Sequence, residues 1–239
     1  MSRSLGKLTL FVVIALHCAS AHAQHYRFES RDPTASWFAY GGFDWQRDRE
    51  TDTNLDAKTL EVRMSLPSYL EFSIRGSELR KETDAGSVTD FGDTTISVTK
   101  GTRRIPHLTY ASIEYGEVAG TAPRALRSET DRYARVRALF GPTLLTFDVS
   151  VTALQLNEPL AGEGDEAFVT SFGIRSQCRQ FYYGIDAVHR AQSGADSSTS
   201  ADFVAMYRRW NGDAIYLTLG KGLDGDEAEF AALGYEYRF

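Results

Sequence analysis

Histidine is the side chain in this sequence best able to act as a general base near neutral pH, so the histidines are the first candidates for catalysis. Beyond residue 23 the chain has His25, His107 and His189. Only His189 lies where a strand would end beside a long polar segment, with Asp186 three residues before it. Period-two alternation turns these two side chains to opposite faces, and the His-x-Ser spacing of outer-membrane phospholipases is absent. His189 is therefore the one catalytic candidate, and the sequence gives it no serine or carboxylate partner.

Other arrangements typical of catalysis or metal binding are missing from the chain beyond residue 23. It has no His-x-x-His or Cys-x-x-Cys spacing, no glycine-rich phosphate loop and no Gly-x-Ser-x-Gly elbow. We therefore predict no metal and no cofactor. Enzymatic activity is left open, with a non-catalytic role favoured.

Charged side chains instead recur at every second position within apolar segments. LEVRMSL (60–66), LEFSIR (70–75) and YARVRALF (133–140) all follow this pattern, which is typical of a strand with one apolar and one polar face. Ionised groups on the polar face need water or an opposite charge, so they predict a polar interior. The residues expected to line a pore are Glu61, Arg63, Glu71, Arg75, Glu114, Arg135, Arg137, Asp148, Asp186, Glu236 and Arg238, and the same alternation turns Asp44, Arg175, Asp202 and Arg208 inward.

Four of the arginines among these residues fall on the second, third and sixth predicted strands, at positions 63, 75, 135 and 137. Two arrangements are open for them: a basic ladder opposite acidic residues of the later strands, or pairing with nearby acids that plugs the barrel. Transverse charge of the first kind is how pores select small ions and polar solutes.

The C-terminal segment AALGYEYRF separates the two faces most clearly. Leu233, Tyr235 and Tyr237 project one way, with Phe239 continuing the series, while polar side chains project the other way. A soluble core strand would not place Glu and Arg on its inner face. A transmembrane barrel strand does so, because its outer face meets lipid and its inner face meets water or a polar plug.

Twelve such segments can be read along the chain, and the connections between them alternate in length. Long polar connections, among them 46–58 and 77–90, alternate with short turns such as Pro67-Ser68 and Gly141-Pro142. Short periplasmic turns and longer extracellular loops are typical of outer-membrane barrels. We predict one antiparallel up-and-down β-barrel of twelve strands, with ten as the alternative. The segments are Trp37–Trp45, Leu60–Leu66, Leu70–Arg75, Thr94–Thr99, Leu108–Tyr115, Tyr133–Phe140, Leu145–Leu154, Phe168–Arg175, Phe181–His189, Asp202–Arg208, Ala214–Gly220 and the terminal strand.

With this pattern the chain resembles the outer-membrane β-barrel proteins of Gram-negative bacteria. The terminal aromatic series Tyr235, Tyr237 and Phe239 looks like the C-terminal signal that the barrel-insertion machinery reads. The resemblance covers the mature chain in architecture and the last strand as a motif. It implies an outer-membrane location, with outer-membrane lipid, lipopolysaccharide and the insertion machinery as partners.

The N-terminus agrees with export. Arg3 and Lys7 precede the apolar run Leu8–Leu16, and Ala21-His22-Ala23 offers small residues at a cleavage site. These are the three parts of a secretory signal peptide. We predict a cleaved signal at 1–23 and a barrel at 24–239. Cleavage leaves one cysteine, Cys178, and so no intrachain disulfide.

Composition narrows the function further. The 239 residues carry a net charge of −6, which argues against nucleic-acid binding, and a mean hydropathy of −0.32 excludes a bundle of membrane helices. We predict a passive, porin-like channel for small polar or anionic solutes. Two alternatives stay open: a plugged structural or anchoring barrel of an envelope assembly, and an outer-membrane lipid hydrolase of the lipid A deacylase or phospholipase kind.

Overall fold

The protein is described here from a computed structural model, which covers residues 36–48, 53–83, 86–120, 122, 130–142, 145–156, 164–194, 197–210, 212–223 and 229–239. The predicted signal peptide lies outside these residues. Almost all of the described chain is β-strand, apart from a short 3-10 turn at Pro67–Tyr69. The strands are β1 (Ser36–Asp48), β2 (Thr53–Leu66), β3 (Leu70–Thr83), β4 (Gly86–Phe91), β5 (Thr94–Thr102), β6 (Tyr110–Ala119), β7 (Thr130–Phe140), β8 (Thr146–Leu156), β9 (Glu166–Cys178), β10 (Phe181–Gln192), β11 (Ser198–Arg208), β12 (Ala214–Gly222) and β13 (Glu229–Arg238).

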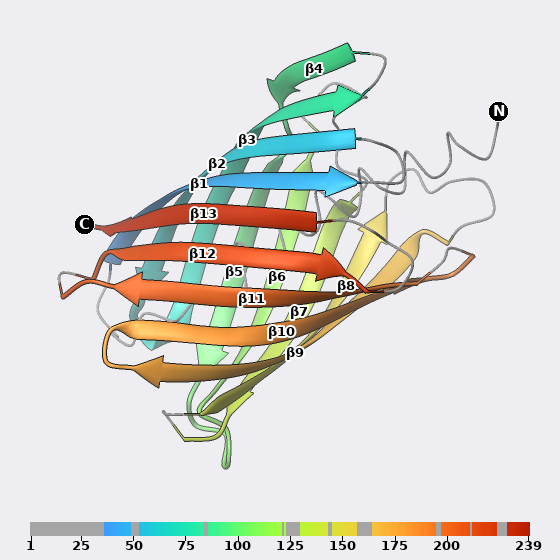
Figure 1. The fold of residues 1–239 in the computed structure, drawn as a ribbon. Helices are drawn as coiled ribbons and strands as arrows, with labels where there is room; N and C mark the ends of the chain where they lie inside the picture. The colour runs from blue at the N-terminus through green and yellow to red at the C-terminus, as the bar shows by residue number, and fades with distance from the viewer. Residues whose placement is uncertain are drawn as a thin grey trace.

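Twelve of these strands close into an antiparallel barrel (Figure 1). Each ring strand pairs with its neighbours in chain order, and β1 pairs with β13 from Phe38 opposite Arg238 to Arg47 opposite Glu229. Closure removes the open edges of the sheet, so the backbone polar groups of the ring strands are satisfied between strands, as a bilayer requires. The predicted up-and-down barrel of twelve strands is confirmed.

The remaining strand, β4, lies outside the ring, at the top of Figure 1. The first half of β3 pairs with β5, while its second half, Glu78–Thr83, pairs with β4. Between β4 and β5 the strand is interrupted at Gly92, whose amide donates to the Ser77 carbonyl at 2.7 Å. This break lets β4 leave the ring while β5 continues it to β6.

Two connections expected to be loops are therefore mostly strand. Segment 77–90 contains the β3–β4 hairpin, and segment 46–58 contains the paired ends of β1 and β2 up to Asp48 opposite Thr53. Charged residues stand on both faces at the end of β3, as at Arg80 and Lys81. Alternation of hydropathy is lost there although the backbone remains paired, which is why the sequence alone indicated loops.

The outer wall of the barrel is apolar and exposed. Leu60, Ile113 and Ile185 are 63%, 62% and 64% exposed, and aromatic side chains such as Trp37 and Tyr237 lie toward the strand ends. A continuous apolar surface of this kind is typical of a wall that faces lipid. No helix among the described residues has the length and hydropathy of a membrane span.

The inner wall is shaped by glycines that leave room for aromatic rings. The Tyr40 ring lies over Gly42 and Gly234, and a Cβ at Gly42 would stand 2.8 Å from Tyr40 Cζ. Tyr40 also meets Tyr216 edge-on, with ring centroids 6.0 Å apart. The glycines of β1 and β13 thus allow a phenol ring to lie flat on the wall.

We expect Gly234→Val to destabilise the barrel by about 1–3 kcal/mol, because the new side chain would displace the Tyr40 ring. Urea unfolding in phospholipid vesicles, followed by tryptophan fluorescence, measures the change. Gly41→Val is the matched control, since a Cβ at Gly41 meets nothing within 4 Å. Equal unfolding midpoints for the two variants would contradict the proposed packing.

Candidate functional site: the ion-paired barrel interior

The charged residues expected on the inner face all lie there. Their strands alternate between buried and exposed positions, and the charged side chains occupy the buried, inward ones. Glu71 and Arg238 are part-buried, and nine others are 1–9% exposed: Glu61, Arg63, Arg75, Glu114, Arg135, Arg137, Asp148, Asp186 and Glu236. Their inward position follows from the period-two pattern. Their role in lining a pore stays a prediction.

One polar network runs across four neighbouring strands, β7 to β10. Arg137 makes two hydrogen bonds to Asp148, Nε to Oδ1 at 2.9 Å and Nη2 to Oδ2 at 2.6 Å. Arg175 Nη2 reaches Asp148 Oδ2 at 3.1 Å and Asp186 Oδ2 at 2.7 Å. Arginine and aspartate thus alternate along one line, which we call the β7–β10 ladder (Arg137, Asp148, Arg175 and Asp186). Charge-assisted, partly bidentate bonds of this kind fix side-chain geometry strongly.

Glycines again make room for this network. Gly184 lies directly opposite Arg175 in the register, and a Cβ there would stand 2.9 Å from Arg175 Cγ. A Cβ at Gly173 would overlap the Asp186 carboxylate. The absence of side chains at these two positions lets Arg175 and Asp186 lie flat against the wall.

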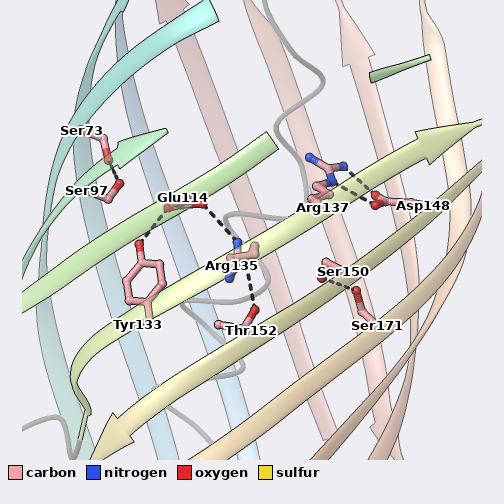
Figure 2. Close-up of polar contacts among 10 residues, drawn as sticks. All are labelled: Ser73, Ser97, Glu114, Tyr133, Arg135, Arg137, Asp148, Ser150, Thr152 and Ser171. Carbon is pink, nitrogen blue, oxygen red and sulfur yellow. Dashed lines mark hydrogen bonds and ion pairs between the residues drawn. The ribbon is translucent and has the colours of Figure 1, made fainter. Parts of the chain in front are cut away.

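A second group surrounds Arg135 (Figure 2). Arg135 Nη1 lies 3.6 Å from Glu114 Oε2 on β6, and its Nε donates to Thr152 Oγ1 on β8 at 3.0 Å. The Tyr133 hydroxyl donates to the other oxygen of Glu114 at 2.8 Å. As Figure 2 shows, Arg135 and Arg137 project from one strand and pair with acids on the two strands beside it.

A third group bridges the seam where the first and last strands meet. Arg63 on β2 is ion-paired with Glu236 on β13, across the width of β1. Its Nε lies 3.7 Å from Glu71 Oε2, and Arg208 Nη2 lies 3.9 Å from Glu236 Oε1. These contacts link both sides of the β1–β13 seam through side chains.

Of the two arrangements open for these arginines, pairing with nearby acids is the one that forms. Arg63, Arg135 and Arg137 each have an acid within 4 Å on a nearby strand. Cross-strand and diagonal neighbours in a sheet are closer than opposite walls, so buried charges pair locally. The inner wall carries interleaved charge instead of a basic side and an acidic side.

His189 has no catalytic surroundings within the described chain. It lies on the exposed outer face of β10, and its Nδ1 is 3.1 Å from Thr199 Oγ1. Its backbone carbonyl accepts a hydrogen bond from Thr170 Oγ1 at 3.5 Å. No group of three or more metal-binding side chains occurs among the described residues.

Two buried charged residues were missed by the sequence reading. Arg190 is 7% exposed and continues the inward series of β10 one residue past the predicted end of that strand. Asp213, 2% exposed, stands just before β12, accepts a hydrogen bond from the Tyr235 hydroxyl at 2.8 Å and lies 3.4 Å from the Arg238 amide. Continued alternation would have located Arg190, whereas no sequence signal indicated Asp213.

Comparisons with known proteins support the fold. No family model matches the chain, and no curated protein matches its sequence. Among solved structures, an outer-membrane channel from Pseudomonas putida F1 aligns with 90% of this chain and 98% of its own, at 14% identity and a TM-score of 0.67. The KdgM porin in complex with disordered oligogalacturonate aligns with 84% of this chain and 99% of its own, at 9% identity and a TM-score of 0.58.

The β domain of the Bordetella autotransporter BrkA aligns as well, with 86% of this chain and 100% of its own, at 11% identity and a TM-score of 0.54. Channels and an autotransporter β domain thus share one architecture, and a fold by itself does not determine function. At these identities the likeness establishes the fold. The chain has the fold of the outer-membrane β-barrels of Gram-negative bacteria, as its terminal strand and alternating pattern predicted.

Proposed function

We propose that this protein is a passive channel for small polar solutes, anionic ones included, in the outer membrane of a Gram-negative bacterium. The observation that carries the proposal is the charged inner wall of a closed barrel whose outer wall is apolar. Ionised groups are expensive to desolvate, so an inner wall rich in arginines and carboxylates suits a water-filled lumen. Under this proposal residues 1–23 are the export signal and residues 24–239 form the channel.

Arginine makes anionic groups suitable solutes. A guanidinium presents several N–H donors in one plane and matches the two oxygens of a carboxylate. Arg135 and Arg137 stand next to each other on the inner face of β7. A solute carboxylate that displaces Glu114 or Asp148 from these arginines therefore finds donors of matching geometry.

Replacing both Arg135 and Arg137 with Ala should shift the reversal potential of the channel toward cation preference. The change leaves Glu114 and Asp148 without these partners, so the local charge becomes more negative, and we expect the anion-to-cation permeability ratio to fall by about twofold or more. Planar-bilayer recordings of refolded protein under a salt gradient provide the measurement. An unchanged reversal potential would mean that these arginines do not line a conducting path.

The same recordings test the channel itself. Discrete conductance steps from folded protein are the expected result. The low exposure of the interior charges favours a second candidate, a plugged structural or anchoring barrel, and a folded but silent protein would support it. A lipid hydrolase is not proposed, because no carboxylate lies within ion-pairing distance of His189 in the described chain.

A further inference from the structure

Positive and negative side chains are nearly balanced on the inner wall, and this balance limits which solutes the proposed channel can favour. Where the ring strands pair with one another in the described chain, eight arginines and eight carboxylates occupy inward positions, and Lys81, opposite Leu55, adds one more cation. The arginines are Arg63, Arg75, Arg135, Arg137, Arg175, Arg190, Arg208 and Arg238, against the carboxylates of Asp44, Glu61, Glu71, Glu114, Asp148, Asp186, Asp202 and Glu236. Positive and negative groups thus nearly balance on the described inner wall, which leaves little net charge to concentrate either anions or cations.

The β7–β10 ladder is the most continuous part of this wall. Its four members alternate in charge over neighbouring strands, at 2.6 to 3.1 Å between paired atoms. Arg137, the most exposed of them, is 9% exposed and Asp186, the least, is 1% exposed. A solute that binds here must therefore take the place of a partner that is already present.

Partner exchange favours one class of solute. A simple anion that displaces Asp186 from Arg175 satisfies the guanidinium but leaves the buried carboxylate without its cation. A simple cation that displaces Arg175 from Asp186 satisfies the carboxylate but leaves the buried guanidinium without its anion. A solute that carries a cationic and an anionic group can satisfy both members at once, so no buried charge is left unpaired.

On the basis of the proposed channel function, we propose that the β7–β10 ladder makes this protein selective for small zwitterions. The ladder binds the carboxylate of the solute through arginine and its ammonium group through aspartate. Glycine at positions 173 and 184 keeps the ladder flat on the wall, so that both charges are presented to the same solute.

The test compares three compounds of similar size in vesicles that contain the full mature protein: β-alanine, propionate and propylammonium. Radiolabelled uptake is measured at zero membrane potential, and single-channel conductance in potassium chloride is recorded in parallel. We expect β-alanine to enter about fivefold faster than either of the other compounds, the size of effect that one well-placed ion pair produces.

The two ends of the ladder provide the variants. Asp186→Asn leaves Arg175 paired with Asp148, and Arg137→Gln leaves Asp148 paired with Arg175, so neither change isolates an inner member. Asp186→Asn should bring propionate uptake close to that of β-alanine, and Arg137→Gln should do so for propylammonium. Lys58→Gln is the matched control, because its ion pair with Glu78 lies on the outer face, 65% and 40% exposed. This control should keep the wild-type preference.

The possible results distinguish failure of the selectivity, of the ladder's role and of the channel itself. Conductance with equal uptake of the three compounds overturns the zwitterion selectivity and leaves the channel standing. Selectivity that survives both end variants places it elsewhere in the barrel and overturns the role of the ladder. A folded protein, identified by heat-modifiable migration on gels, that passes neither ions nor solutes overturns the channel and this inference with it.

Discussion

Removal of Phe239 should leave the protein in the periplasm and deplete it from the outer membrane. Phe239 is 71% exposed on the outer wall, and its amide donates to the Trp37 carbonyl at 3.0 Å. Its ring meets the Tyr237 ring at 4.9 Å, with an interplanar angle of 83°. An exposed residue contributes little to barrel packing, so a large defect would arise from recognition of the terminus during insertion.

Cell fractionation followed by immunoblotting measures this effect. Phe239→Ala removes the ring while keeping the backbone, and Phe239→Tyr keeps an aromatic residue at the end of the chain. Phe91→Ala is the matched control, because Phe91 is 72% exposed and lies on β4, outside the ring. Normal insertion of the Phe239→Ala variant would show that the terminal aromatic series is not the insertion signal.

The two faces of the barrel could be predicted because a strand has a strict period of two. Leu233 and Tyr235 lie on the outer wall, and Glu236 lies inside, as alternation requires. A one-residue error would have inverted each strand, so the correct placement of Arg63 or Asp148 depends only on parity within one segment. Local pattern was sufficient for the architecture and for which residues face inward.

Contacts within the barrel could not be predicted in the same way. The pairing of Arg175 with both Asp148 and Asp186 depends on the register of three consecutive strands and on side-chain rotamers, which the alternation of hydropathy does not specify. The clearance over Gly173 depends on the rotamer of a neighbour that sequence does not specify. The departure of β4 from the ring likewise needs the geometry of the break at Gly92.

Arg175, in the middle of the β7–β10 ladder, should be the charged residue whose replacement destabilises the barrel most. Arg175 is 3% exposed and is the cation in contact with Asp186, whose Oδ2 lies 2.7 Å from its Nη2. Arg175→Met removes this cation while keeping much of the side-chain volume. A buried carboxylate that loses its partner destabilises a fold by about 3–5 kcal/mol, because the desolvation of its charge is no longer offset.

Urea unfolding in phospholipid vesicles, followed by the fluorescence of the native tryptophans, would measure this loss. A second change, Asp186→Asn, made together with Arg175→Met removes the isolated charge and should recover part of the free energy of unfolding. Lys58→Met breaks an exposed pair on the outer face and should cost about 0–1 kcal/mol. If Arg175→Met costs no more than Lys58→Met, the ladder does not stabilise the barrel. Recovery by the double variant, in contrast, would locate the penalty at the Asp186 carboxylate, which is the group that a solute's cation must satisfy in the selectivity proposed above.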